Sequence, residues 1–259
     1  MKNHLVSSFF LLFCFGLVLP TYAATIYYTG FENPPFTTGA IDGQNGWATY
    51  GTSSAAQVES SVAESGSQAV DVIPSLAASQ TGPYYAVSTG ANEVELSAYI
   101  MIDSSSVQSN WQFAATGPAL TGYIGGVNIS NTGQIGLISG SQPDVGTFAY
   151  NSWQYFDFVF DFATQTYDFS LNGTLISANA PFCGSNSGCT GAPVATFGDA
   201  FFDTFPAMSA NDIGYMDNIT ISSVPEPRLA VFLGAALLAF AALRRLKNKA
   251  ASRPARLTS

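Results

Sequence analysis

The groups in this sequence that could perform chemistry are almost all carboxylates. The 200 residues 24–223 contain sixteen Asp and Glu residues and no Lys, Arg or His. Two of these acids, Glu93 and Glu95, are two positions apart, so they would project from the same face of a β-strand. Glycoside hydrolysis uses a pair of carboxylates, one as general acid and the other as base or nucleophile. The pair is therefore a candidate for acid–base chemistry on a glycosidic bond.

The missing bases exclude several other kinds of site. Seven of the eight Lys and Arg residues follow residue 223 and the eighth is Lys2, so the net charge of −9 hides a middle segment of −16. Proteins that bind DNA or RNA need Lys and Arg to neutralise phosphates, so a nucleic-acid partner is not expected. A P-loop, a Ser-His-Asp triad and a histidine metal site are impossible in this segment.

The middle segment has two cysteines, Cys183 and Cys189, which flank five residues rich in Gly, Ser and Asn. In an oxidising compartment such a pair predicts a disulfide across a short loop. Closing so short a ring stabilises the fold by about 2 kcal/mol in the chain-entropy model. A two-cysteine metal site is the alternative, but no His or third Cys is present to complete it.

The segment that must position these groups has the pattern of β-strands. Over 155–162, Phe occupies every second position, which predicts a strand with one buried face. The alternation repeats at Tyr167, Phe169 and Leu171, and Asn172-Gly173 is a two-residue hairpin signal. Further strands are predicted over 93–102 and 213–221, and weaker ones over 26–31, 69–73, 84–87, 122–129 and 134–138. Residues 24–223 are therefore expected to form one all-β sandwich domain.

The two ends of the chain are predicted to direct export. Residues 1–23 combine Lys2 and His4 with an apolar run over 9–19, which is typical of a signal peptide cleaved after Ala23. Residues 229–243 carry no charge and are followed by a cluster of Arg and Lys, which predicts a short membrane-spanning helix with its basic end in the cytoplasm. An uncleaved N-terminal anchor and a plain C-terminal tail anchor are the alternatives.

The residues before the second apolar stretch carry a family resemblance. Pro225, Glu226 and Pro227 precede the apolar stretch and its basic end, and 250–259 form a basic tail. Over 224–249 this order is similar to the PEP-CTERM sorting signal. The resemblance implies a Gram-negative bacterium that makes exopolysaccharide. It also implies transient anchoring in the inner membrane and an exosortase that releases or transfers the protein.

A second resemblance covers 26–222. Trp153, Asp157 and Asp161, followed by Asn172-Gly173, look like the core hairpin of the concanavalin A-like lectin/glucanase (laminin G-like) superfamily. Segments 30–32, 43–47, 65–69 and 216–219 resemble other parts of its bacterial members. The resemblance implies a jelly-roll sandwich.

This superfamily resemblance bears on both the catalytic and the metal hypotheses. The glucanase signature is Glu-x-Asp-x-x-Glu, or one residue longer, and the residues after Glu95 supply no acid at its third position. In many jelly-roll modules a Glu after the first strand and an Asp in the last strand share a structural calcium. Glu32 and Asp217 match that placement, so a Ca²⁺ site is predicted there.

The function expected from the sequence is that of a secreted, non-enzymatic protein of the cell envelope or extracellular matrix, associated with exopolysaccharide. Exposed aromatic residues could bind sugars, although core positions are the safer interpretation; the candidates are Trp47, Trp111, Tyr84, Tyr85 and Tyr123. The alternatives are a glycoside hydrolase or lyase that works through carboxylates alone, and an inert stalk.

Overall fold

The structure is a computed structural model that describes residues 23–78, 80–103, 107–139, 143–183 and 194–224, together with 240, 241 and 244. The segment Ala23–Val224 forms one compact unit. The described residues include no helix that is both long and apolar enough to cross a membrane. The signal peptide, the sorting motif and nearly all of the second apolar stretch lie outside the described residues, so these predictions are not tested.

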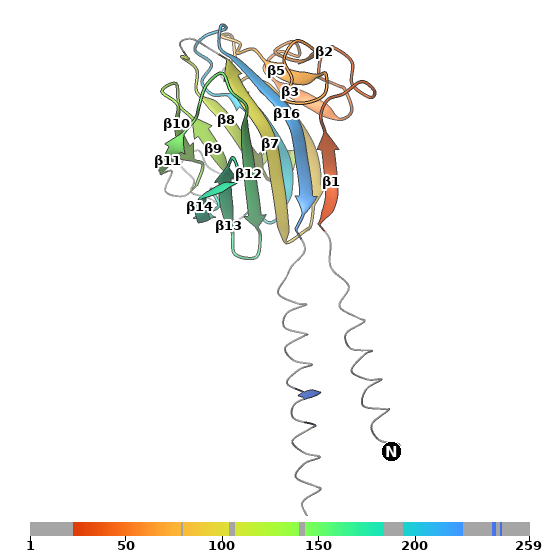
Figure 1. The fold of residues 1–259 in the computed structure, drawn as a ribbon, viewed down its shortest axis with the longest axis vertical. Coiled ribbons are helices and arrows are strands. Elements are labelled where there is room, and N and C mark those ends of the chain that lie inside the picture. The colour runs from red at the N-terminus through yellow and green to blue at the C-terminus, as the bar shows by residue number, and fades with distance from the viewer. Residues whose placement is uncertain are drawn as a thin grey trace, which may run out of the picture. The chain divides into compact units, whose positions relative to one another are not determined.

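One layer of the domain is an antiparallel sheet of nine strands, in the order β14-β13-β12-β7-β16-β5-β4-β2, with β1 also paired to β16 (Figure 1). Its strands are β1 (Ala24–Thr29), β2 (Gly39–Ala40), β4 (Ala56–Glu59), β5 (Ala69–Val72), β7 (Glu93–Asp103), β12 (Gln154–Asp161), β13 (Thr166–Leu171), β14 (Thr174–Pro181) and β16 (Ile213–Ser223).

The other layer is an antiparallel sheet of seven strands, in the order β11-β10-β9-β8-β15-β6-β3. Its strands are β3 (Trp47–Tyr50), β6 (Gly82–Thr89), β8 (Trp111–Thr116), β9 (Tyr123–Ile129), β10 (Gln134–Leu137), β11 (Asp144–Thr147) and β15 (Phe197–Thr204). A 3₁₀ turn, η1 (Pro118–Leu120), connects β8 to β9.

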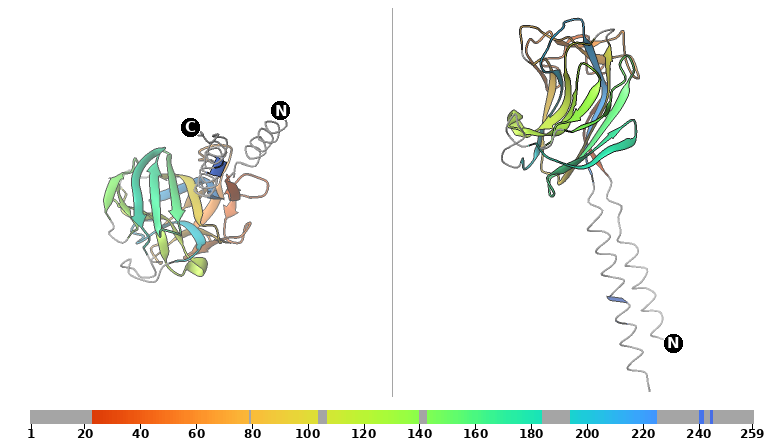
Figure 2. Two further views of the ribbon diagram at one scale, coloured as in Figure 1. Left: turned by 90° about the horizontal axis from the view of Figure 1, so that it is seen from below. Right: turned by 90° about the vertical axis from the view of Figure 1, so that its left-hand side faces the viewer.

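The two sheets pack face to face (Figure 2). The side chains between them form an aromatic-rich core. Phe113 of β8 lies 5.6 Å from Phe158 of β12, centroid to centroid, and meets it edge-on. Tyr167 of β13 reaches across the core, where its hydroxyl oxygen lies 3.0 Å from the carbonyl oxygens of Gly126 and Ile138. Gly125 leaves room for this ring, since a Cβ there would come within 2.5 Å of it.

The strands with a clear alternation occur where the sequence predicts them. Phe156, Phe158 and Phe160 of β12 are fully buried, and the intervening residues are partly exposed. The hairpin at Asn172-Gly173 connects β13 to β14. Six strands were not predicted from the sequence: β2, β3, β4, β8, β11 and β15. Every residue of β8 and β15 is buried, so neither strand shows the period-two pattern on which the prediction relied.

Candidate functional site

The outward face of the seven-stranded sheet is a partly buried surface that carries polar side chains. Trp111 and Phe113 of β8 point into the core, whereas Gln112 between them points outward yet is only 7% exposed. Ala114 and Phe201 form a second apolar cluster on this outward side, and Tyr50, Tyr84 and Tyr123 pack against it. Aromatic side chains therefore cover part of this face.

Strand register arranges polar side chains in a row across the face. Asp203 of β15 is opposite Gln112 of β8. Gln112 is in turn opposite Asn128 of β9, and Asn128 is opposite Gly136 of β10. The Tyr123 hydroxyl donates a hydrogen bond of 3.2 Å to Gln112 Oε1. The row leads into a hollow of about 510 Å³. Its lining consists of Asn110, Gln112, Tyr123, Asn128, Ser130, Gln134, Gly136, Leu137, Ile138, Asp144, Cys183, Phe205 and Pro206.

Asp203 is the fully buried acid of this row. Its Oδ2 atom accepts a hydrogen bond from Gln80 Nε2. Its Oδ1 atom is buried and has no hydrogen-bond partner within the part of the chain that the structure describes. Burial raises the pKa of this carboxyl to about 8. Asp203 is therefore a neutral hydrogen-bonding group at mildly acidic pH.

Asp199 lies on the same side of β15, four residues before Asp203. Its Oδ2 atom accepts a hydrogen bond of 2.9 Å from the backbone N–H of Leu120, and burial raises its pKa. Neither acid was predicted from the sequence as a site residue. The signal that could have revealed them is the spacing of Asp199, Phe201 and Asp203, which puts all three on one face of a strand.

The structure places Glu93 and Glu95 on the other sheet. Both lie on β7, and Glu95 is opposite Val159 of β12 and Ser222 of β16 on the outward face of the nine-stranded sheet. The Ser222 hydroxyl donates to Glu95 Oε2 at 3.1 Å. Burial, with a smaller contribution from the nearby Glu95, raises the pKa of Asp157 to about 6. The Glu93–Glu95 pair is thus separate from the hollow.

The structure separates the five aromatic candidates into two groups. Trp47 and Trp111 are 2% and 0% exposed and belong to the core. Tyr85 packs against the core beside Trp47, with ring centroids 5.4 Å apart. Tyr84 and Tyr123 lie on the outward face of the seven-stranded sheet, and Tyr123 lines the hollow. Tyr123 therefore stays a candidate for contact with a sugar.

The predicted calcium ligands Glu32 and Asp217 both contact the loop over 60–68, which leads into β5. On one side of β16, β5 pairs as far as Met216 and β1 pairs from Ile219 onward. Asp217 lies in this interval, where its Oδ2 atom accepts hydrogen bonds from the backbone N–H groups of Glu64 and Ser65 at 3.0 and 3.2 Å.

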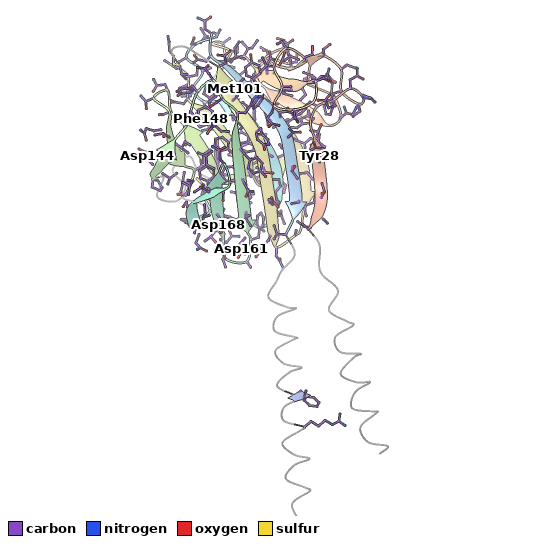
Figure 3. The ribbon with its side chains drawn as sticks, viewed as in Figure 1. Tyr28, Met101, Asp144, Phe148, Asp161 and Asp168 are labelled. Carbon is purple, nitrogen blue, oxygen red and sulfur yellow. The ribbon has the colours of Figure 1, made fainter. Side chains whose placement is uncertain are left out.

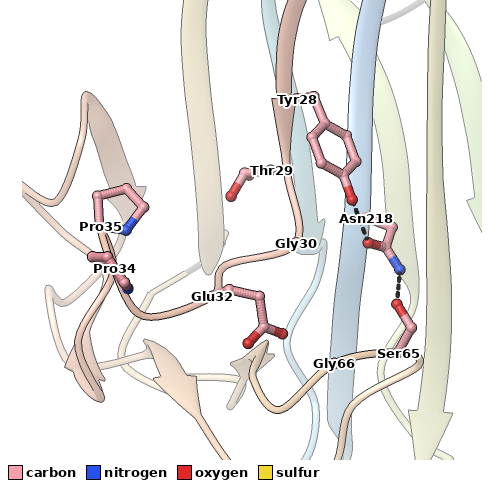
Figure 4. Close-up of a pocket in the computed structure, with 9 residues that line it drawn as sticks. All are labelled: Tyr28, Thr29, Gly30, Glu32, Pro34, Pro35, Ser65, Gly66 and Asn218. Atoms are coloured by element: carbon pink, nitrogen blue, oxygen red, sulfur yellow. Dashed lines mark hydrogen bonds between the residues drawn. The ribbon is translucent and has the colours of Figure 1, made fainter.

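Glu32 holds the other end of the same loop (Figure 4). Its Oε1 atom accepts hydrogen bonds from the backbone N–H groups of Ser67 and Gln68 at 2.8 and 3.2 Å, and its Oε2 atom accepts one from the Ser67 hydroxyl at 2.6 Å. These hydrogen bonds lower the pKa of Glu32. Gly66 allows the close approach, since a Cβ there would lie 2.1 Å from Glu32 Oε1.

The donors around this loop are of the type that calcium prefers. Glu32, Ser65 and Asn218 line a hollow of about 270 Å³, so carboxylate, hydroxyl and amide oxygens gather there. Among the described residues, no three His, Cys, Asp or Glu side chains are grouped so as to hold a metal ion. Calcium at Glu32 and Asp217 stays a prediction, beside the observed role of both acids in anchoring the loop.

Two further predictions fall wholly or partly outside the described residues. Cys183 is 3% exposed and borders the hollow of the seven-stranded sheet, but Cys189 is not described, so the disulfide stays a prediction. The sorting motif at Pro225, Glu226 and Pro227 is likewise not described.

Comparisons with known proteins bear on the fold. No protein family and no curated protein matches the sequence. Among solved structures, a sialidase superimposes with a TM-score of 0.53 at 14% identity; the match covers 72% of this chain but only 18% of the sialidase. The catalytic domain of a glycoside hydrolase family 131 protein from Coprinopsis cinerea has a TM-score of 0.49 at 13% identity, covering 70% of this chain and 84% of that one. The cellulose-induced protein Cip1 has a TM-score of 0.48 at 15% identity, covering 76% and 97%.

These likenesses concern architecture alone. The predicted fold class, an all-β jelly-roll sandwich, is confirmed. The predicted C-terminal helix is not, because the described residues cover too little of it.

Buried Asp203 generates a prediction about stability and pH. Its pKa of about 8 in the folded state is above the usual 3.8, so the folded protein binds a proton that the unfolded chain has released. Stability is therefore expected to fall as the pH rises from about 4 to about 8, by about 1 kcal/mol per pH unit. Urea unfolding across this range measures the slope. Asp203→Asn should flatten it between about pH 6 and 8, whereas Asp42→Asn, at an exposed position, should not. An unchanged slope in Asp203→Asn would contradict this account.

The loop anchored by Glu32 and Asp217 generates the calcium prediction. Calcium should raise the melting temperature of the wild-type domain and EDTA should lower it, because a ligand that binds only the folded state stabilises it. In Glu32→Gln and Asp217→Asn the calcium-dependent shift should disappear. Both variants should also melt below the wild type in EDTA, because each weakens an anchor of the loop. Identical wild-type melting curves in calcium and in EDTA would rule out the metal and leave the anchoring role.

Proposed function

We propose that this protein is a secreted, non-enzymatic component of the extracellular matrix whose domain binds carbohydrate on the outward face of the seven-stranded sheet. The observation that carries the proposal is the row of Asp203, Gln112 and Asn128, which leads into the hollow.

The chemistry of the hollow supports a sugar ligand. Four side-chain amides line it, and amides can both donate hydrogen bonds to sugar hydroxyls and accept them. Tyr123 adds an aromatic ring and a hydroxyl at the same place. A volume of about 510 Å³ is within the usual range for small-molecule sites.

Export and sorting complete the proposal. The segment 1–23 would direct secretion across the inner membrane of a Gram-negative bacterium. The segment 224–249 would anchor the chain until an exosortase acts at the Pro225-Glu226-Pro227 signal. A protein delivered in this way would meet extracellular polysaccharide, which is the partner that we propose for the hollow.

Calcium would have a structural role in this protein. Bound by Glu32 and Asp217, it would link the segment after β1 to the last strand and to the loop over 60–68. The ion would neutralise part of the negative charge of a domain that contains no Lys, Arg or His. No other cofactor is proposed.

A second candidate function, a glycoside hydrolase or lyase, is favoured by Asp199 and Asp203. Both acids lie beside the proposed binding face and both have raised pKa values. Their backbone positions, four residues apart on one strand, are separated by about 13 Å, whereas the paired carboxyls of glycosidases are about 5 to 9.5 Å apart. Asp203 is also 0% exposed beneath Gln80. The binding function therefore has the stronger support.

The binding function makes a direct prediction. The purified domain should retain an oligosaccharide on a glycan array without releasing reducing ends. Asn128→Ala should weaken that binding about five- to tenfold through the loss of hydrogen bonds to the sugar. Gln57→Ala, on the other sheet, is the matched control and should bind like the wild type. Release of reducing ends that disappears in Asp203→Asn would instead support the enzyme, and no retention of any glycan would contradict the binding function.

Sorting makes a separate prediction. In a host that produces an exosortase, the wild-type chain should lose its C-terminal segment, and mass spectrometry of the mature protein should show this. Replacing Pro225, Glu226 and Pro227 together by Ala should leave the chain uncleaved in the inner membrane. Normal processing of the triple variant would contradict the assignment of the signal. An Ala triplet over 250–252, downstream of the signal, is the control and should be processed normally.

A further inference from the structure

One charged group lies among the polar groups of the hollow. Asp144 of β11 is opposite Gly136 of β10, and Figure 3 shows its side chain at the edge of the domain beside β11. A Cβ on Gly136 would come within 3.3 Å of Asp144 Oδ1, so the glycine leaves room for the carboxylate beside β10. The other polar lining groups are amides and hydroxyls, which carry no charge.

A second acid, Asp203, lies next to the lining of the same hollow. Asp203 is the neighbour of Gln112 across the strands, and Gln112 lines the hollow. The acid also affects Tyr123. Burial, and to a smaller extent the charge of Asp203, raises the pKa of the Tyr123 hydroxyl to about 12. Asp203 is neutral at mildly acidic pH, where Asp144 supplies the charge, and its ionisation would add to the negative potential of Asp144 only at higher pH.

The rest of the domain supplies no base to offset these charges. Residues 24–223 contain sixteen carboxylates and no Lys, Arg or His. An acidic sugar in the hollow would meet like charges without a counter-ion, whereas an ammonium group would meet carboxylate and amide oxygens. Because salt screens exposed charges over about 8 Å at physiological ionic strength, the nearby Asp144 should matter more than distant acids.

We propose that the hollow selects glycans by charge, binding sugars that carry protonated amino groups more tightly than neutral sugars, and neutral sugars more tightly than acidic ones. This inference rests on the proposed carbohydrate-binding function. It adds a ligand class, amino sugars in a deacetylated polysaccharide, and it makes Asp144 a residue that determines specificity.

The test uses four β-1,4-linked hexamers with the same backbone: glucosamine, N-acetylglucosamine, glucose and glucuronic acid. Calorimetric titrations are done in EDTA, so that calcium cannot bridge acids, and at mildly acidic pH, where the amines are protonated. Glucosamine hexamer should bind at least about tenfold tighter than its N-acetylated form, and glucuronic acid hexamer at least about tenfold weaker than the glucose hexamer. Both ratios should shrink as salt is added.

Two matched variants locate the effect. Asp144→Asn and Asp42→Asn each remove one exposed acid, but Asp42 lies between β2 and β3, and β3 is at the edge of the seven-stranded sheet remote from β11. Asp144→Asn should reduce the preference for glucosamine about threefold. Asp42→Asn should preserve it.

Each other outcome overturns the inference in a distinguishable way. Equal affinity for all four hexamers, or tighter binding of the acidic one, would overturn charge selection and leave carbohydrate binding standing. An equal loss of preference in both variants would assign the effect to the charge of the whole domain and overturn the role of Asp144. Failure to bind any hexamer or any glycan on the array would overturn the proposed function, and the inference with it.

Discussion

Backbone N–H groups take the place of cations in this domain. Sixteen carboxylates fold in a segment without Lys, Arg or His, so none of them can form a salt bridge within it. In the part of the chain that the structure describes, the acids that accept hydrogen bonds from backbone N–H groups include Glu32, Glu59, Asp71, Asp161, Asp168, Asp199, Asp212 and Asp217. Hydrogen bonds to a buried charged group stabilise it by about 1.5–3 kcal/mol each. They offset only part of the cost of burial here, since burial still raises the pKa of Asp71, Asp199 and Asp217.

These carboxylate hydrogen bonds determine where the loops of the sandwich lie. Asp212 accepts from Gln108 and Ser109 at 3.0 and 2.7 Å, and so ties the segment before β8 to the segment before β16. Asp199 ties η1 to the face of β15 in the same way. The loops that border the proposed binding face are therefore held by acids. Carboxylates therefore both position these loops and contribute to the polar surface where a ligand is proposed.

Two acids differ from these: Asp157 and Asp203 each have a buried Oδ1 atom without a hydrogen-bond partner among the described residues. Burial without a hydrogen-bond partner favours the protonated form of a carboxyl, because the charged form would lose its hydration. Hydrogen bonds lower the pKa of Glu32 and so favour its charged form, whereas burial raises the pKa of Asp157, Asp217 and Asp203 and so favours their neutral forms. Of these, Asp203 lies beneath the face where a polar ligand is proposed.

The sequence alone determined the fold class and the half-exposed strands, because alternation such as that of Phe156, Phe158 and Phe160 is a local property of the chain. The predicted calcium site at Glu32 and Asp217 stays a prediction; the structure shows that both acids accept hydrogen bonds from one loop. The sequence could not place the candidate binding face. Strands β8 and β15 are buried on both sides and carry no alternating signal, and Asp203, Gln112 and Asn128 come from three separate segments. Only the register between strands brings those side chains into one row, and register depends on packing contacts between residues far apart in the chain.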